Sequence, residues 1–223
     1  MNNTDSHIEF GHEHVDLGLS VNWATCNIGA GSPEEYGDYY SWGELEPKAE
    51  YTHVNYKLLE PGSDRSYLNL TKYNYHDNII TLEPSDDVAR DKWGGSWRLP
   101  TKAEFDELMA NSHFEPVTIN GSDGYKVTSM VAGYTDRSIF LPLAGYCMQM
   151  LENHILAGDG MVGRYWSSSV CTDKEVDHLS KSYGYDTDLR NAWCLHINPK
   201  DGRIKLYDEY RYMGFSVRSV FEK

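Results

Sequence analysis

Length, composition and charge narrow the classes of protein to which this sequence belongs. It has 223 residues, 40% of them hydrophobic, which is enough to bury a core without metals or disulfides. Its 20 Lys and Arg stand against 34 Asp and Glu, and the net charge of -14 disfavours nucleic acid and anionic membrane surfaces as partners. No run approaches the roughly 20 apolar residues of a transmembrane helix, which argues against membrane insertion.

The N-terminus and the cysteines leave the compartment open. Residues 1–7 lack the basic and apolar regions of a signal peptide, so either the protein stays inside the cell or the chain begins after a removed leader. The four cysteines contain no CxxC pair, and both free thiols and disulfides remain open. Cys194 lies in an apolar run and is expected to be a buried free thiol.

The first part of the chain predicts a disordered end, a strand and a long loop-rich stretch. Residues 1–12 are expected to be disordered, and residues 13–223 to form a single domain. Apolar and polar residues alternate from Val15 to Trp23, which predicts one strand with a buried face. Residues 29–82 are rich in Gly, Pro, Asn, Asp and Tyr and show no periodicity, which indicates a loop-rich architecture.

Two short helices are predicted next. The first begins after Ser85, which caps it, and ends at Gly94–Gly95. The second begins at Thr101, which forms a capping box with Glu104. Three apolar residues then share one face of this helix: Phe105, Leu108 and Met109.

The rest of the chain has the pattern of short strands. They are expected within residues 125–129, 139–141, 165–167, 193–197, 204–207 and 215–220. Pro142 should end a strand or lie at a sheet edge, and residues 199–202 read as a hairpin turn. Three tryptophans are expected to be buried: Trp97, Trp166 and Trp193. The predicted class is α+β, with two short helices, several short, mostly antiparallel strands and long loops.

Several motifs suggest a metal, nucleotide or catalytic site, but the residues around each motif do not support that function. His12 and His14 flank Glu13, but the segment leads into a strand and not into a metal-binding helix. Residues 158–163 match GxGxxG, yet a strand-like segment follows where a nucleotide site needs a helix. Ser167–Ser169 lack a nucleophile elbow, and the acidic residues between 173 and 188 lack EF-hand spacing. No catalytic residue, metal or cofactor is therefore assigned.

A family resemblance extends over nearly the whole chain. It is carried, in order, by residues 15–27, 33–44, 86–89, 93–101, 139–142, 163–169 and 214–218. Together these segments resemble the Fibrobacter succinogenes major paralogous domain family. The resemblance implies a C-type lectin-like fold and a surface or secreted bacterial protein.

Two further resemblances concern function. Residues 97–101 are similar to a block in formylglycine-generating enzymes, but the close cysteine pair of those enzymes has no match, since Cys171 and Cys194 lie far apart in the sequence. Residues 206–213, followed by Gly214–Arg218, resemble the ending of variable proteins of diversity-generating retroelements. The motifs of calcium-dependent sugar binders are incomplete, because no Trp-Asn-Asp occurs.

We therefore expect a non-enzymatic ligand-binding module of the adhesin or receptor-binding type, with a face rich in Tyr and Asp near its C-terminus. The expected ligand residues are Tyr183, Tyr185, Asp186, Asp188, Arg190, Tyr207, Asp208, Tyr210 and Tyr212. Tyr210 and Tyr212 should share one face of an extended segment and meet the same partner. The acidic balance favours a protein or an uncharged glycan as partner and disfavours sulfated glycans.

Several alternatives stay open at this point. The chain resembles a retroelement variable protein of a phage or a cell surface, which is one alternative, and an oxidoreductase similar to formylglycine-generating enzymes is another. A structural part of a surface fibre or a phage particle is the third. The expected location is extracellular or on the cell surface, with a phage particle or the cytoplasm as alternatives, and the oligomeric state is open.

Overall fold

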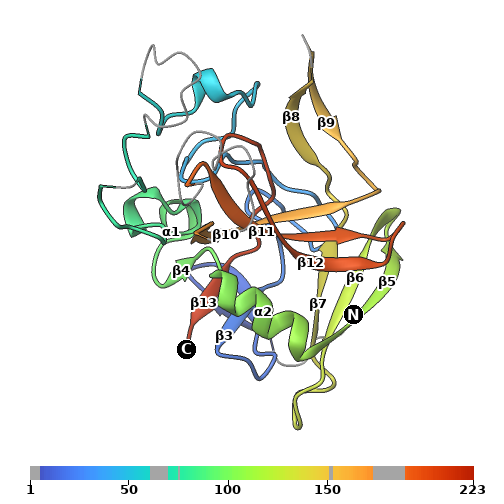
Figure 1. Ribbon diagram of the computed structural model, residues 1–223. Coiled ribbons are helices and arrows are strands. Elements are labelled where there is room, and N and C mark those ends of the chain that lie inside the picture. Colours follow the sequence, from blue (N-terminus) through green and yellow to red (C-terminus); the bar gives the residue numbers. More distant parts are fainter. Residues whose placement is uncertain (1–5, 61–69, 75, 151–152, 173–188) are drawn as a thin grey trace.

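Antiparallel strands dominate the structure. The computed structural model describes residues 6–60, 70–74, 76–150, 153–172 and 189–223. Within these ranges the α-helices are α1 (Val88–Trp93) and α2 (Lys102–Ala110), and every pairing between named strands is antiparallel (Figure 1). The predicted α+β class with few helices is thus confirmed.

One sheet brings the two ends of the chain together. It has five strands in the order β1 (Ser6–Glu9), β2 (His12–Val15), β3 (Val21–Ala24), β13 (Val220–Glu222) and β4 (Trp97–Arg98). The last strand is inserted between β3 and β4, so the C-terminal residues complete the N-terminal sheet. The predicted disorder of residues 1–12 is wrong from Ser6 onward, because β1 and β2 pair as a hairpin.

The single strand predicted from Val15 to Trp23 is interrupted. Residues between β2 and β3 form a loop in which Gly18 has a φ of +76° and donates its N–H to Asp16 Oδ1 at 2.8 Å. A Cβ at Gly18 would lie 2.6 Å from the Tyr134 ring, so only glycine fits. The alternation still identifies the buried side chains: Val15, Leu17, Leu19, Val21 and Trp23 are all at most 4% exposed.

The start of one of the two helices was predicted correctly from the sequence, and the start of the other was not. The capping box at Thr101 is confirmed, since its side chain accepts from Glu104 N–H and the Glu104 side chain accepts from Thr101 N–H. The cap predicted at Ser85 is wrong. Pro84–Asp86 form a 3-10 turn, and Asp87 caps α1 by accepting from the N–H groups of Ala89 and Arg90. Gly94 ends α1, as expected.

Three further sheets follow. Strands β5 (Ser112–Ile119), β6 (Ser122–Ser129) and β7 (Ser138–Pro142) form one, β8 (Tyr146–Met150) and β9 (Asn153–Ala157) the second, and β10 (Gly163–Val170), β11 (Asn191–Asn198) and β12 (Arg203–Tyr210) the third. Pro142 ends the edge strand β7, and residues 199–202 turn between β11 and β12; both predictions are confirmed. The β8–β9 hairpin, at the upper right of Figure 1, was not predicted.

The strand predicted across residues 215–220 is wrong. Phe215 and Ser216 form only isolated bridges, with Tyr40 and Tyr165, and regular pairing starts at Val220. The segment first bonds to Tyr40 and Tyr165 and only then pairs with β3 and β4, so it does not form one continuous strand. The loop-rich character predicted for residues 29–82 is confirmed where the structure describes them, since they contain only isolated bridges and the short η1 helix (His53–Asn55) before η2.

The core consists of two apolar clusters against opposite faces of the same strands. Trp166 and Cys194 belong to one cluster, and their neighbours Tyr165 and Leu195 belong to the other. Helix α2 covers the second cluster, which includes Phe105. Strands β10 and β11 therefore form a wall that both clusters share.

The cysteines and tryptophans test the burial predictions. All four thiols are free, and Cys194 is fully buried as expected. Trp97 and Trp166 are also fully buried. The prediction is wrong for Trp193, which is half-buried at the sheet surface beneath Lys102, whose Nζ lies 4.9 Å from the ring centre.

Candidate functional site

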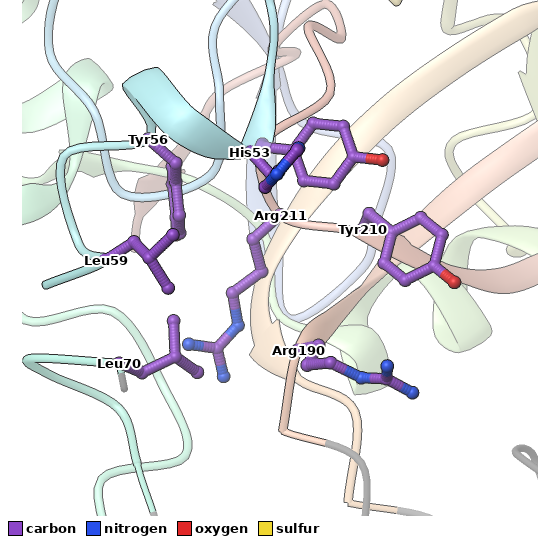
Figure 2. Close-up of a pocket in the computed structure, with 8 residues that line it drawn as sticks. His53, Tyr56, Leu59, Leu70, Arg190, Tyr210 and Arg211 are labelled. Atoms are coloured by element: carbon purple, nitrogen blue, oxygen red, sulfur yellow. The ribbon is translucent and has the colours of Figure 1, made fainter. Parts of the chain in front are cut away.

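The structure brings some of the expected ligand residues together and separates others. Four of them, Tyr183, Tyr185, Asp186 and Asp188, lie outside the described residues. Arg190, Tyr210 and Tyr212 meet at one shallow surface hollow. The hollow is lined by His53, Tyr56, Leu59, Leu70, Arg190, Tyr210, Arg211 and Tyr212 (Figure 2).

Two parallel tyrosines form the aromatic wall of this hollow. The ring centres of Tyr210 and Tyr212 lie 5.5 Å apart, with 13° between the ring planes. The Arg190 guanidinium carbon lies 5.9 Å from the Tyr210 ring centre, and His53 meets Tyr212 edge-on at 6.1 Å. The hollow therefore has planar side chains on one side, held by contacts with one another.

The reason given above for the tyrosine pair needs correction. The segment is not extended, because β12 ends at Tyr210 and the N–H of Met213 donates to the Tyr210 carbonyl at 3.0 Å, which closes a turn. This turn, and not strand alternation, places the two rings side by side. Arg211, between them in sequence, points inward and is 1% exposed.

The floor of the hollow is fixed by buried polar contacts. Arg211 donates through Nη2 to the Tyr73 carbonyl at 3.0 Å, and its guanidinium carbon lies 4.7 Å from the Trp42 ring centre. Tyr56 donates its hydroxyl to the Trp42 carbonyl at 2.7 Å, and burial raises the pKa of Tyr56 well above its usual value. These bonds fix Tyr56 and Arg211 in place beneath the hollow.

The aliphatic side was missed by sequence reasoning. Leu59 and Leu70 face Tyr210 and Arg190 across the hollow in Figure 2, and they come from the loop-rich region. No periodicity marks them. The one local signal is a capping box in which Thr52 and Asn55 exchange hydrogen bonds around η1, which orients His53.

Tyr207 and Asp208 do not join the hollow. Side chains alternate along β12, whose register with β11 is unbroken, so Tyr207 lies on the face opposite Asp208 and Tyr210. Asp208 Oδ2 accepts from Asn191 Nδ2 at 2.7 Å. Tyr207 instead packs edge-on to His196, with ring centres 5.0 Å apart. The expected Tyr- and Asp-rich face is thus divided between two sides of one strand.

The other motifs have structural roles where the structure describes them. Gly163 begins strand β10, so the GxGxxG segment does not open a helix. Ser167 Oγ donates to the Trp193 carbonyl at 2.8 Å, and Ser169 Oγ accepts from Lys102 N–H at 3.0 Å. Among the described residues no group of three or more His, Cys, Asp or Glu is placed to hold a metal ion.

The two histidines near the N-terminus form aromatic stacks. His12 stacks on Trp93 with ring centres 4.1 Å apart, and His14 stacks on Phe221 at 5.3 Å. His14 is 4% exposed, and neither of its ring nitrogens has a hydrogen-bond partner among the described residues. Burial, followed by the charge of nearby His7, lowers the pKa of His14; the carboxylates of Glu9, Asp16 and Glu13 oppose this shift.

The buried His14 predicts a loss of stability in mild acid. A lowered folded-state pKa means that the unfolded chain binds the proton more tightly, so stability is full above pH 6.5 and falls as the pH drops below it. From pH 8 to pH 6 the share of His14 is at most about 0.8 kcal/mol. Urea unfolding at both pH values measures it. His14→Phe keeps a stacked ring and should reduce the difference, whereas an unchanged difference would contradict this role for His14.

Comparison with known proteins adds no relative. Neither the family models, nor the curated proteins, nor the solved structures give a match to this chain. The resemblances described from the sequence therefore stay predictions. No helix in the described part of the chain has the length and apolar character needed to cross a membrane.

Proposed function

We propose that this protein is a non-enzymatic ligand-binding module, and that its ligand binds at the hollow beside Tyr210 and Tyr212. The observation that supports the proposal most is the parallel tyrosine pair at the edge of the hollow. We further propose that the α+β scaffold is a variant of the C-type lectin-like fold, and that the protein acts outside the cell or on its surface.

The shape of the hollow supports recognition by aromatic stacking. Tyr gives a large contact area at low cost in conformational entropy, and its hydroxyl adds a hydrogen bond at the wet edge. Leu59 and Leu70 supply the opposing apolar surface, and Tyr56 and Arg211 are fixed beneath. Preformed sites with aromatic walls lose less entropy on binding than mobile ones do.

The lining favours a ligand with a flat or apolar face. A sugar ring or the side chain of a protein loop can stack on the tyrosine wall and contact the leucines, whereas a fully hydrated ion gains nothing from such surfaces. The predicted partner, a protein or an uncharged glycan, agrees with this lining. Asp208 contributes less to the site than expected, because it is bound to Asn191 on β11.

A double substitution tests the proposal. Tyr210→Ala with Tyr212→Ala should weaken binding to the best ligand from an array of uncharged glycans or a displayed peptide library by about 30-fold or more, as for interface hot spots. Tyr207→Ala is the matched control, since it removes the same side chain from the other face of β12. Thermal melting of all three proteins checks the fold.

The outcomes separate recognition from packing. If the tyrosines bind ligand, the double variant melts near the parent and loses binding, while Tyr207→Ala keeps it. If they only cover the core, the double variant melts far below the parent. A well-folded double variant that binds at full strength would rule the site out.

A diversified receptor is the second candidate. Tyr210, Arg211 and Tyr212 fall in the segment that resembles the variable end of retroelement-linked proteins, and all three line the hollow. Variation at Tyr210 and Tyr212 would alter the wall of the hollow, whereas Arg211 is buried and part of its floor. Sequencing the genomic neighbourhood tests this candidate: a reverse transcriptase gene beside a near-repeat of the last coding stretch is the expected finding.

A further inference from the structure

One face of the β10–β12 sheet, the face that also bears the core residues Trp166 and Cys194, carries basic side chains in register. Arg164 on β10 pairs with His196 on β11, and His196 pairs with Lys205 on β12. Residues paired directly across a sheet lie on the same face, so these three form one row across three strands. Arg203 lies two positions from Lys205 on the same face of β12.

Carboxylates balance only part of this charge. Arg164 is paired with Glu209, and Arg203 Nε lies 3.3 Å from Asp201 Oδ2. Lys205 is exposed, and within the part of the chain that the structure describes its ammonium forms no ion pair; it lies 4.0 Å from the ring centre of Tyr207. Lys205 and Arg203 are like charges two positions apart on one face, and of the two only Arg203 has a carboxylate partner, so a bound counter-charge would stabilise Lys205 most.

The pKa values of Tyr207 and His196 are both lowered at this face, and its basic side chains contribute to both shifts. Hydrogen bonding to Lys205, and secondarily to Arg203, lowers the pKa of Tyr207 against the trend of burial. Burial, together with the charges of Arg164, Lys205 and Arg203, lowers the pKa of His196 to about 4, although Asp201 opposes the shift. His196 is thus neutral at pH 7 and offers the row a nitrogen without adding charge.

We propose that Lys205, Arg203 and the Tyr207 hydroxyl form a binding site for an oxyanion, the carboxylate, sulfate or phosphate group of a ligand. An ammonium, a guanidinium and a phenol present donors of the kind that charge-assisted hydrogen bonds to oxyanions use. The site lies on the face of β12 opposite Tyr210, so it is separate from the aromatic hollow.

This proposal revises the inference drawn from the net charge. A chain of charge -14 repels anions at long range, but charges more than a Debye length of about 10 Å away are largely screened, so the nearby Lys205 and Arg203 weigh more at this face than the net charge. Anionic ligands are therefore admitted at this face, although the whole-chain charge disfavours them. The site does not depend on the function proposed for the hollow.

Anion titration at pH 7.5, followed by NMR, tests the proposal. Sodium sulfate, phosphate and acetate are added separately, each against sodium chloride of equal ionic strength, and the amide signals of His196, Lys205 and Tyr207 are followed. Saturable shifts are expected with at least one oxyanion and not with chloride; the anion with the highest affinity identifies the group. Lys205→Gln should weaken that affinity about 10-fold, the loss of one charge-assisted hydrogen bond.

Two control variants test whether the loss of affinity is specific to the proposed oxyanion site. Lys126→Gln removes the same charge from β6, in another sheet, and should leave the affinity unchanged. The Tyr210 and Tyr212 double variant should also keep it, which separates this site from the hollow. Shifts that do not saturate, that chloride reproduces, or that persist at full affinity in Lys205→Gln would overturn the proposal.

Discussion

Replacing Trp166 with Ala is expected to lower the free energy of unfolding by about 3–5 kcal/mol, the range for large aromatic side chains in a core. Trp166 is fully buried, and its ring stacks on Phe215 with ring centres 4.1 Å apart. Its Nε1 donates to the Tyr40 carbonyl at 2.8 Å, so the substitution leaves a cavity and also removes one of the two hydrogen bonds to that carbonyl, which keeps the bond from Phe215 N–H.

Trp193→Ala is the matched comparison for this prediction. Trp193 lies on the neighbouring strand β11, but it is half-buried, and Lys102 shields its ring from one side. We expect a loss of about 1–2 kcal/mol, since the space it leaves opens to solvent. Urea unfolding of both variants gives the difference. A Trp166→Ala protein as stable as Trp193→Ala would show that the stack on Phe215 is not an anchor of the core.

Elements determined by local chemistry were predictable from the sequence. The capping box at Thr101 and the turn at residues 199–202 depend on side chains within a few positions, and both were located correctly. The cap of α1 was missed by two residues. Pro84 favours a 3-10 turn ahead of the helix, and that turn leaves the capping position to Asp87.

Elements determined by distant partners were not predictable. The alternation from Val15 to Trp23 identified buried side chains but not the loop at Gly18, where the Tyr134 ring packs against the backbone. The segment from Phe215 onward has apolar strand residues, yet it exchanges hydrogen bonds with Tyr40 before it enters the N-terminal sheet. Burial follows composition, whereas pairing depends on tertiary contacts that a single sequence does not display.

The candidate site also combines residues that the sequence identified with residues that only tertiary contacts bring to it. Composition singled out Tyr210 and Tyr212, while the leucines that face them come from a loop more than a hundred residues earlier in the chain. Strand alternation alone would have separated Tyr207 from Tyr210, had the strand been extended to Tyr210. Net charge was the weakest guide, because the side chains of Arg164, His196 and Lys205 are brought into one row only by the register of three strands.

The second large effect is expected at Asp87. This carboxylate is 3% exposed, and its Oδ1 accepts from the N–H groups of Ala89 at 2.9 Å and Arg90 at 3.3 Å. Its Oδ2 accepts from Leu99 N–H at 2.8 Å, which joins the start of α1 to the end of β4. Asp87→Ala should lower the free energy of unfolding by about 2–4 kcal/mol, from the lost cap and the unpaired buried N–H of Leu99.

Two further variants distinguish the cap from the bond to Leu99. Asp91→Ala removes an exposed carboxylate from the same helix and should change the free energy of unfolding by less than about 0.5 kcal/mol. Asp87→Asn keeps an oxygen for the cap but turns an amide N–H₂ toward Leu99 N–H, so an intermediate loss in urea unfolding is expected. If Asp87→Asn were as stable as the parent, the bond to Leu99 would contribute nothing. The junction of α1 with β4 would then depend on apolar packing alone, chiefly that of Trp97 and Leu99 in the core.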